Sequence, residues 1–442
     1  MNTGVTSAAS GLLTNHKIIS RGVTMKKHVV KLSFWLFFSL LSLITFSHAQ
    51  LKIQVTKSAS NAIPIVLYSN DQLGNFVEQV AGGDLARSGR FIALPSKNSP
   101  EPTAGPAAIN SEAWMQRGVQ YAVFLTVRGN QISVDLVNTF SKQSMLQRVY
   151  TVGANNERQW RKTAHQVADA IYEKILGVKG SFDTKVAYVA KNGRQYQLIV
   201  SDADGAYPST IFNSNEPILS PSWSPDGRSI AYSSLEGKKS KIVVQDVYSG
   251  KRHVVLDLPG INGAPSWSPD GSRLVFTLSK DGNPEIYTSD IYGKGLTRLT
   301  NHASIDTEPV WGKDNMIYFT SDRTGAPQIY RMSPNGGTPT RVSTSGNYNA
   351  SPSISNDGRY LAVMNRGSGG NGFGIAIIDL QTGATKRLTN GGKDEAPSFS
   401  SNGHMIIYAN GVGGLNAVSN DGSVTQKFSS NASDVREPAW SN

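Results

Sequence analysis

The seven residues PSWSPDG occur twice in this 442-residue chain, at 221–227 and again at 265–271. Related segments follow at nearly the same spacing, and they align on six positions: Trp223, Trp267, Trp311, Ile354, Phe399 and Trp440. Six copies with one period near 44 residues predict an architecture built from repeated structural units.

The letters of each repeat predict short β-strands. Ser-Pro-Asp-Gly suits a type I turn, and alternating apolar segments such as 229–234 and 273–278 follow it. Further strand-like segments complete the unit, and four short strands per repeat are typical of a β-propeller blade. We therefore interpret Asp226 and Asp270 as turn residues rather than as catalytic acids.

The end of the chain predicts how the propeller closes. The last repeat stops after its first strand, at PAWS 438–441, whereas residues 185–214 contain strand-like segments for a blade that lacks its first strand. Joining the two gives a six-bladed β-propeller over 181–442, a closed ring without exposed edges.

The region before the propeller has a different pattern and predicts a smaller α/β domain over 62–180. Strand-like and helix-like segments alternate, ending with an amphipathic helix over 156–177. His165 and Asp169 lie four residues apart on this helix. We interpret them as a surface or interdomain contact rather than as an acid–base pair, because no third partner is visible.

The start of the chain predicts export. After Met25 come two lysines, an apolar run at 32–46 and the small-x-small tripeptide 47–49, as in a secretory signal peptide cleaved after Ala49. The apolar run is shorter than a membrane span needs. We interpret Met25 as the true start and 1–24 as an extension. The mature chain would then be periplasmic in a two-membrane bacterium and would not span a membrane.

The mature N-terminal segment 50–61 begins with an alternating strand pattern. A free terminal strand can add to the sheet edge of a partner protein. The same pattern also fits an ordinary edge strand of its own domain, and the sequence leaves both interpretations open.

Composition and motifs give no sign of chemistry. The chain has no cysteine, which excludes disulfides and thiolate sites. Without residues 1–49 the net charge is +6 and forms no basic stripe, so nucleic acid is not a predicted partner. The G-x-G-x-x-G match at 367–372 lies between strands, and the DADG segment with Asp202 and Asp204 lacks the other ligands of a calcium loop. We predict no catalytic residue, cofactor or metal.

Several segments resemble the TolB family of the Tol–Pal cell-envelope system. They are AHQVADAIYEKILGVKGSFDTKVAYV (164–189), LPGINGAPSWSPDG (258–271), DTEPVW (306–311) and TSDRTGAPQIYRM (320–332). The similarity extends over Gln50–Asn442. It implies a non-enzymatic periplasmic interaction protein that links the outer-membrane lipoprotein Pal to the C-terminal domain of TolA. Such a protein maintains outer-membrane integrity and constriction at division, and other outer-membrane proteins are further partners to consider.

The resemblance also implies binding residues. The Pal-binding face would include Asn262, Gly263 and Ala264 from an N-G-A-P loop, and Thr307 and Glu308 from a T-E-P loop. Ile261 departs from the family, which often has His there. The TolA-binding segment would contain Gln50, Leu51, Lys52, Ile53, Gln54 and Val55, although it is less acidic than is usual in the family.

Two other functions were weighed against this one. A propeller that gates a serine peptidase needs a hydrolase domain of roughly 200 residues, and 62–180 contains no G-x-S-x-G nucleophile motif. A ligand-binding propeller, with a sugar or a metal ion in its channel, stays open as the alternative.

Overall fold

The structure is a computed structural model that describes residues 51–98, 100, 107, 109–153, 156–367, 369 and 372–442. The predicted signal peptide, the start at Met25 and residue Gln50 lie outside these residues. Within the described ranges, no helix is long and apolar enough to cross a membrane.

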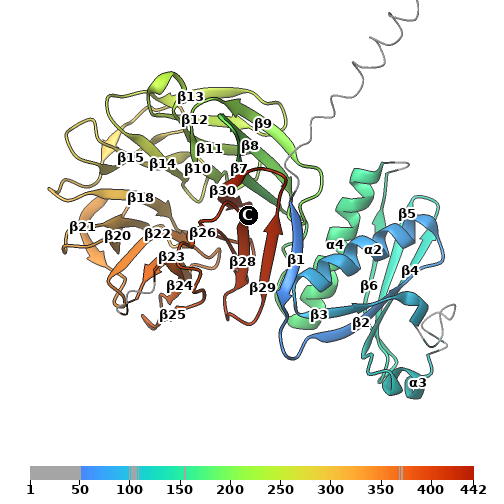
Figure 1. Cartoon of the computed structure of the whole chain (residues 1–442). Coiled ribbons are helices and arrows are strands. Elements are labelled where there is room, and N and C mark those ends of the chain that lie inside the picture. The colour runs from blue at the N-terminus through green and yellow to red at the C-terminus, as the bar shows by residue number, and fades with distance from the viewer. Residues whose placement is uncertain are drawn as a thin grey trace, which may run out of the picture. The chain divides into compact units, whose positions relative to one another are not determined.

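The second half of the described chain is a β-propeller, as predicted (Figure 1). Its described residues form six antiparallel sheets, numbered here as blades 1 to 6 in ring order. Blades 2 to 6 are each continuous in sequence. Blade 2 contains β10 (Ile218–Trp223), β11 (Ser229–Ser234), β12 (Lys241–Asp246) and β13 (Arg252–Leu256), and blade 3 contains β14 (Asn262–Trp267), β15 (Arg273–Leu278), β16 (Glu285–Asp290) and β17 (Thr297–Arg298). Blade 4 contains β18 (Asp306–Trp311), β19 (Ile317–Ser321), β20 (Gln328–Ser333) and β21 (Gly336–Arg341); blade 5 contains β22 (Tyr348–Ile354), β23 (Tyr360–Arg366), β24 (Gly374–Asp379) and β25 (Thr385–Arg387); and blade 6 contains β26 (Glu395–Phe399), β27 (Met405–Ala409), β28 (Leu415–Ser419) and β29 (Thr425–Ser429).

Blade 1 is assembled from the two ends of the propeller sequence. The C-terminal strand β30 (Asp434–Trp440) pairs antiparallel with β7 (Lys185–Asn192), and β8 (Gln195–Asp202) and β9 (Ser209–Ser214) complete the sheet. Val435 lies opposite Ala190, and Ala439 lies opposite Ala187. The C-terminal strand therefore closes the ring, as the truncated last repeat predicts.

The repeated motif makes the same connections in successive blades. In the first copy, Ser224 Oγ donates to Asp226 Oδ1 at 2.6 Å and accepts from the Ser229 N–H at 2.9 Å, which closes the turn. The indole of Trp223 donates to the Ala439 carbonyl of blade 1, and the indole of Trp267 donates to Ser222 of blade 2, both at 3.0 Å. In the next blade the indole of Trp311 donates instead to Asn315 of the same blade at 3.1 Å, so this indole bond to the preceding blade belongs to the two full PSWSPDG copies.

The N-terminal region forms a five-stranded sheet with helices on both faces. The strand order is β3-β2-β4-β5-β6. Helices α2 and α4 pack on one face, and the short α3 covers the other through buried Trp114. The elements are β2 (Ile63–Tyr68), α2 (Gln72–Arg87), β3 (Phe91–Leu94), η1 (Ser96–Asn98), α3 (Ser111–Gln116), β4 (Tyr121–Arg128), β5 (Gln131–Asn138), β6 (Gln143–Thr151) and α4 (Glu157–Leu176). The α/β domain is thus confirmed, but sequence reasoning missed η1, α3 and β6.

The first described strand, β1 (Lys52–Lys57), is an edge strand within the chain itself, and its addition to a partner's sheet stays a prediction. It pairs antiparallel with β29, so it forms a fifth strand at the outer edge of blade 6 (Figure 1). Ile53 lies opposite Phe428, and Leu51 just before the strand is buried. The segment is therefore an edge strand of the propeller, not of the α/β domain.

Candidate functional site

The inner strands share an unusual backbone feature. Each contains a residue with positive φ directly before a proline, and the strand pairing shifts register there. Residues before proline favour extended backbone, and positive φ is uncommon for any residue other than glycine, so each position is strained. The six are Ser220 (φ 51°), Ala264 (48°), Glu308 (53°), Ser351 (50°), Ala396 (50°) and Glu437 (53°).

These six residues line the central channel, whose volume is about 540 Å³. Two of them form bonds between adjacent blades. Glu437 accepts from the Ser220 N–H at 2.9 Å, and Glu308 accepts from the Ser351 N–H at 2.8 Å and its hydroxyl at 2.9 Å. Burial, reinforced by the charges of Glu395 and Glu308, raises the pKa of Glu437. The positive-φ residues thus form a braced ring around the channel.

The predicted N-G-A-P residues lie at one end of this channel but have different roles. Asn262 is fully buried, where its side-chain amide donates to the Leu258 carbonyl at 2.7 Å and accepts from the Leu258 N–H at 3.1 Å. It positions the loop and does not face solvent. Ala264 lines the channel and donates its N–H to Ser233 Oγ at 3.2 Å. Gly263 is half-buried, and a methyl group added there would make ordinary contacts.

The predicted T-E-P residues lie at the same end in the next blade. Thr307 is half-buried and its hydroxyl lies 3.4 Å from that of Thr277. Glu308 is committed to the contacts with Ser351 and to a 2.9 Å bond from Thr320. The same end carries exposed apolar side chains at Ile261, Ile305 and Val412 (49, 46 and 82 % exposed). We call this end, defined by Ile261, Ala264, Ile305, Thr307 and Val412, the mouth face.

The described residues of the predicted segment 50–55 alternate between buried or half-buried and exposed side chains along the strand. Leu51 and Ile53 pack on the core between blades 6 and 1, whereas Lys52 and Gln54 are exposed. Beyond it, the Thr56 hydroxyl lies 2.8 Å from that of Thr425 on β29. Apart from the buried Leu51, the segment is held mainly by one row of backbone pairs.

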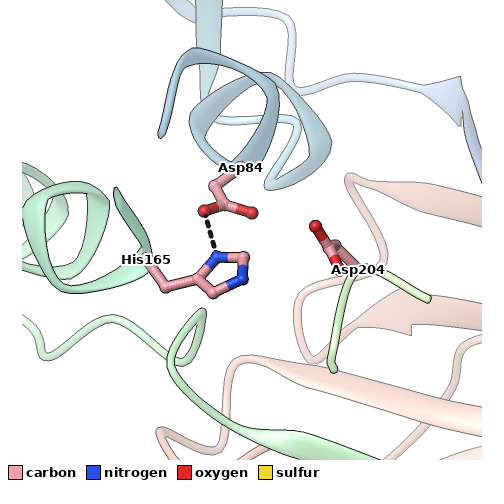
Figure 2. A group of neighbouring side chains, drawn as sticks. All are labelled: Asp84, His165 and Asp204. Atoms are coloured by element: carbon pink, nitrogen blue, oxygen red, sulfur yellow. Dashed lines mark hydrogen bonds and ion pairs between the residues drawn. The ribbon is translucent and has the colours of Figure 1, made fainter. Parts of the chain in front are cut away.

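A buried charged cluster lies where the α/β domain meets blade 1 (Figure 2). His165 Nδ1 on α4 is 2.7 Å from Asp84 Oδ2 on α2, and Asp204 on the turn after β8 lies beside them. Arg87 forms ion pairs with Asp84 and Asp204, and Arg161 forms one with Asp204. Burial alone would raise the pKa of Asp204, but the charges of Arg87, His165 and Arg161 hold this pKa below its ordinary value.

The cluster has the spacing of a cation site but not the charge. One nitrogen or oxygen atom from each of Asp84, His165 and Asp204 lies within 4.8 Å of the others. However, the two guanidinium groups already occupy carboxylate oxygens, and they would repel a cation. We therefore assign no metal to this cluster.

His165 and Asp169 are not paired with each other. Asp169 accepts from the backbone N–H groups of Phe182 (2.8 Å) and Asp183 (3.1 Å), and burial raises its pKa to about 6. Both residues instead make contacts at the domain boundary, in agreement with the interdomain contact predicted for this helix. Sequence reasoning missed Asp84, Arg87 and Arg161, since no local motif marks them.

Comparisons with known proteins agree with the fold. The family described as "TolB amino-terminal domain" matches residues 51–145, and the family described as "TolB beta propeller domain" matches residues 172–442. The Tol-Pal system protein TolB of Bordetella pertussis is 39% identical over 407 residues, covering 89% of this chain and 91% of that protein. The protein of the same name from Xanthomonas oryzae pv. oryzae is 43% identical over 411 residues, with 88% and 92% covered.

A solved structure shows the same architecture. The crystal structure of TolB from Acinetobacter baumannii superposes with a TM-score of 0.82 at 38% identity and covers 89% of this chain and 100% of that one. Both domains and nearly the whole described length are therefore shared with these proteins. The chain belongs to the TolB family of Tol–Pal system proteins.

Proposed function

We propose that this protein is a non-enzymatic periplasmic interaction protein that links Pal in the outer membrane to the TolA complex of the inner membrane. Its role would be to maintain outer-membrane integrity and to support constriction of that membrane during cell division. The observation that carries the proposal is the mouth face, an end of the propeller with exposed apolar side chains and, among the described residues, no catalytic constellation.

The mouth face suits a folded partner such as Pal. Exposed apolar side chains from three blades, Ile261, Ile305 and Val412, lie on loops at the end of the propeller where the inner strands begin. Clustered exposed apolar residues mark interaction sites, and a stable interface would bury about 1,600 Å² in total. In this proposal Asn262 and Glu308 position the loops, whereas Ala264 and Thr307 lie close enough to the surface to contact Pal.

Strand β1 suits the binding of TolA by strand addition. It is the first described strand, alternates in burial and, among the described residues, pairs through its backbone with one strand, β29. A segment of this kind can leave its own blade and pair with a partner's sheet edge. We propose that Pal binding shifts the balance between docked and free β1, and unchanged proteolysis of residues 51–61 on adding Pal would refute that coupling.

Calorimetric titration with the soluble domain of Pal from the same organism tests the main proposal. We expect saturable one-to-one binding, and a loss of at least about tenfold in affinity for Ala264→Phe or Thr307→Trp, which place bulk on the mouth face. Lys294→Trp is the matched control, because Lys294 is exposed on a turn at the opposite end of blade 3. Absence of binding at two temperatures would remove Pal as the partner.

The channel itself supports one second candidate. Its volume of about 540 Å³ falls in the range of small-ligand sites. A sugar or a metal ion held there would raise the melting temperature in a thermal-shift screen of glycans and metals. A positive screen combined with no Pal binding would favour the ligand-binding propeller.

A further inference from the structure

The inference concerns the buried charged cluster of Asp84, Arg87, Arg161, His165 and Asp204. The side chains of His165, Asp84 and Asp204 are only 2 to 3% exposed. Two carboxylates and two guanidinium groups balance one another, so the cluster is neutral when His165 is neutral. A proton on His165 therefore decides whether this buried site carries a net positive charge.

Two buried side-chain atoms of the cluster lack a hydrogen bond: Nε2 of His165 and Nε of Arg161, the latter 3.9 Å from Asp202 Oδ2. His165 Nδ1 is bonded to Asp84, whereas Nε2 is buried without a hydrogen bond. Figure 2 shows Nε2 on the side of the ring toward Asp204. In neutral His165 this nitrogen is a lone pair next to a carboxylate, and a buried polar atom without a partner costs free energy. Protonation turns Nε2 into a donor that faces Asp204.

The charged groups around His165 have both signs. The acidic ones are Asp84 on α2, Asp169 on α4, Asp202 and Asp204 at the β8–β9 turn, and Asp421 after β28. The basic ones are Arg87 on α2, Arg90 before β3, Arg161 on α4 and Lys185 on β7, and His404 before β27 is a further titratable group. Burial and the charge of Arg161 lower the pKa of His165, but the hydrogen bond and charge of Asp84 and the charge of Asp204 outweigh both, so the pKa is raised above its ordinary value of 6.5.

The cluster is also in contact with the docking site of β1. Gly205, next to Asp204, lies against the Leu51 carbonyl at the entry to β1. The Arg87 carbonyl accepts from Gln426 Nε2 at 2.5 Å, and Gln426 on β29 lies opposite Val55 of β1. Ile53, Arg87 and Asp204 line the same cavity of about 50 Å³. A change at Asp204 or Arg87 thus reaches β1 through one residue.

We propose that His165 is a pH-sensitive latch: its protonated ring joins Asp84 of the α/β domain to Asp204 of the propeller, and this junction holds β1 on blade 6. Loss of the proton leaves Asp204 with its two arginine ion pairs and the Ala206 N–H, removes its link to His165, and loosens the turn that covers Leu51. The regulatory meaning of the latch rests on the proposed function, in which β1 leaves to bind TolA. The proton linkage itself is a property of this chain and is measured without any partner.

The direction of the effect follows from linkage. A histidine whose folded-state pKa is raised stabilises the docked state fully below pH 6.5, and that contribution is lost as the pH rises through the folded-state value. Because the proposed junction holds β1, docking of β1 should weaken as the pH rises above 6.5, through the folded-state pKa of His165. His404, also at this boundary, has a lowered pKa through burial and the charge of Arg90, so its contribution has the opposite sign.

Hydrogen–deuterium exchange on the purified full-length protein tests the latch. The protection of the β1 amides, corrected for intrinsic exchange, should fall about threefold to tenfold from pH 6 to pH 8.5 in the unmodified protein. In His165→Gln it should be low and independent of pH. His404→Gln is the matched control and should keep the fall. Equal pH dependence with and without His165 would overturn the latch.

Two further measurements test the latch if His165→Gln does not fold or if a metal ion binds the cluster in place of the proton. The described part of the chain contains four histidines. In an NMR titration of the unmodified protein, one of them must have a pKa above 6.5, and this raised pKa must be lost in Asp204→Asn. A His165 that does not titrate overturns the proposal. If zinc raises the melting temperature at pH 7.5 in the unmodified protein but not in Asp204→Asn, the cluster binds a metal ion rather than a proton, and the latch is overturned. Failure of β1 to bind TolA would end the proposed function and leave the proton linkage standing.

Discussion

Strands β1 and β30 come from opposite ends of the described chain, and both pair antiparallel with a propeller blade. β30 lies at the inner edge of blade 1 and buries Val435 and Ala439, whereas β1 lies at the outer edge of blade 6 and leaves alternate residues exposed. One strand closes the ring and the other is added to a sheet already complete. Similar pairing therefore closes the ring in one case and, in the proposed function, serves reversible docking in the other.

Deleting each strand tests this contrast most strongly. Removing 434–442 exposes the β7 edge and removes the Ala439 carbonyl that binds the Trp223 indole, so we expect no cooperative unfolding transition. Removing the chain through Lys57 should leave a folded propeller and lower the melting temperature by less than about 10 °C. Circular dichroism and gel filtration distinguish the two. A stable monomer without 434–442 would contradict the closure argument.

The anchoring side chains give a smaller contrast of the same kind. Trp440 on β30 packs beside the core between blades 6 and 1 and donates to Thr184 Oγ1 at 2.9 Å, so Trp440→Ala should cost about 3 kcal/mol of unfolding free energy. Ile53 on β1 is half-buried in the same core, and Ile53→Ala should cost about 1 kcal/mol. Denaturant titration measures both. Equal costs would mean that β1 is as integral as β30.

The contrast also marks where sequence reasoning succeeds. The propeller and its closure by β30 were predicted because six copies repeat one pattern and the last copy is truncated. The alternation of Leu51, Ile53 and Val55 identifies a half-buried strand, but the edge that it joins depends on a segment more than 360 residues away. Such pairing follows from three-dimensional proximity and leaves no local signal.

The charged cluster was missed for a related reason. Asp84, Arg87 and Arg161 occupy ordinary positions on two amphipathic helices, and Asp204 sits in a turn that looks like any other Asp-Gly turn. Only their meeting at one boundary gives them a role. The short α3 and the polar strand β6 were missed because six residues and a weak alternation are poor signals.

Asp169 and His165 should affect the free energy of unfolding in different pH ranges. Asp169 caps the segment that leads into β7, the partner of β30, and burial raises its pKa from 3.8 to about 6. An acid with a raised folded-state pKa loses stability as the pH rises through this interval, here by about 1–3 kcal/mol between pH 4 and 6. Asp169→Asn should flatten this loss in chemical denaturation at several pH values. His165→Gln is the control, because its effect belongs above pH 6.5.

The smallest expected effect tests the strain in the inner strands, a feature that β1 lacks. Ser220 has φ 51° before Pro221 and donates its N–H to Glu437 of β30, a bond that glycine would keep. Because glycine adopts positive φ without a steric penalty, Ser220→Gly should raise the unfolding free energy by up to about 1 kcal/mol. Ser222→Gly, two residues along the same strand and equally half-buried, should lower it by about 0.5–1 kcal/mol. Opposite signs in denaturant titration would show that closure of the ring holds a strained backbone in place, whereas a loss in both variants would mean that the positive-φ positions are relaxed and that β30 closes the ring without strain.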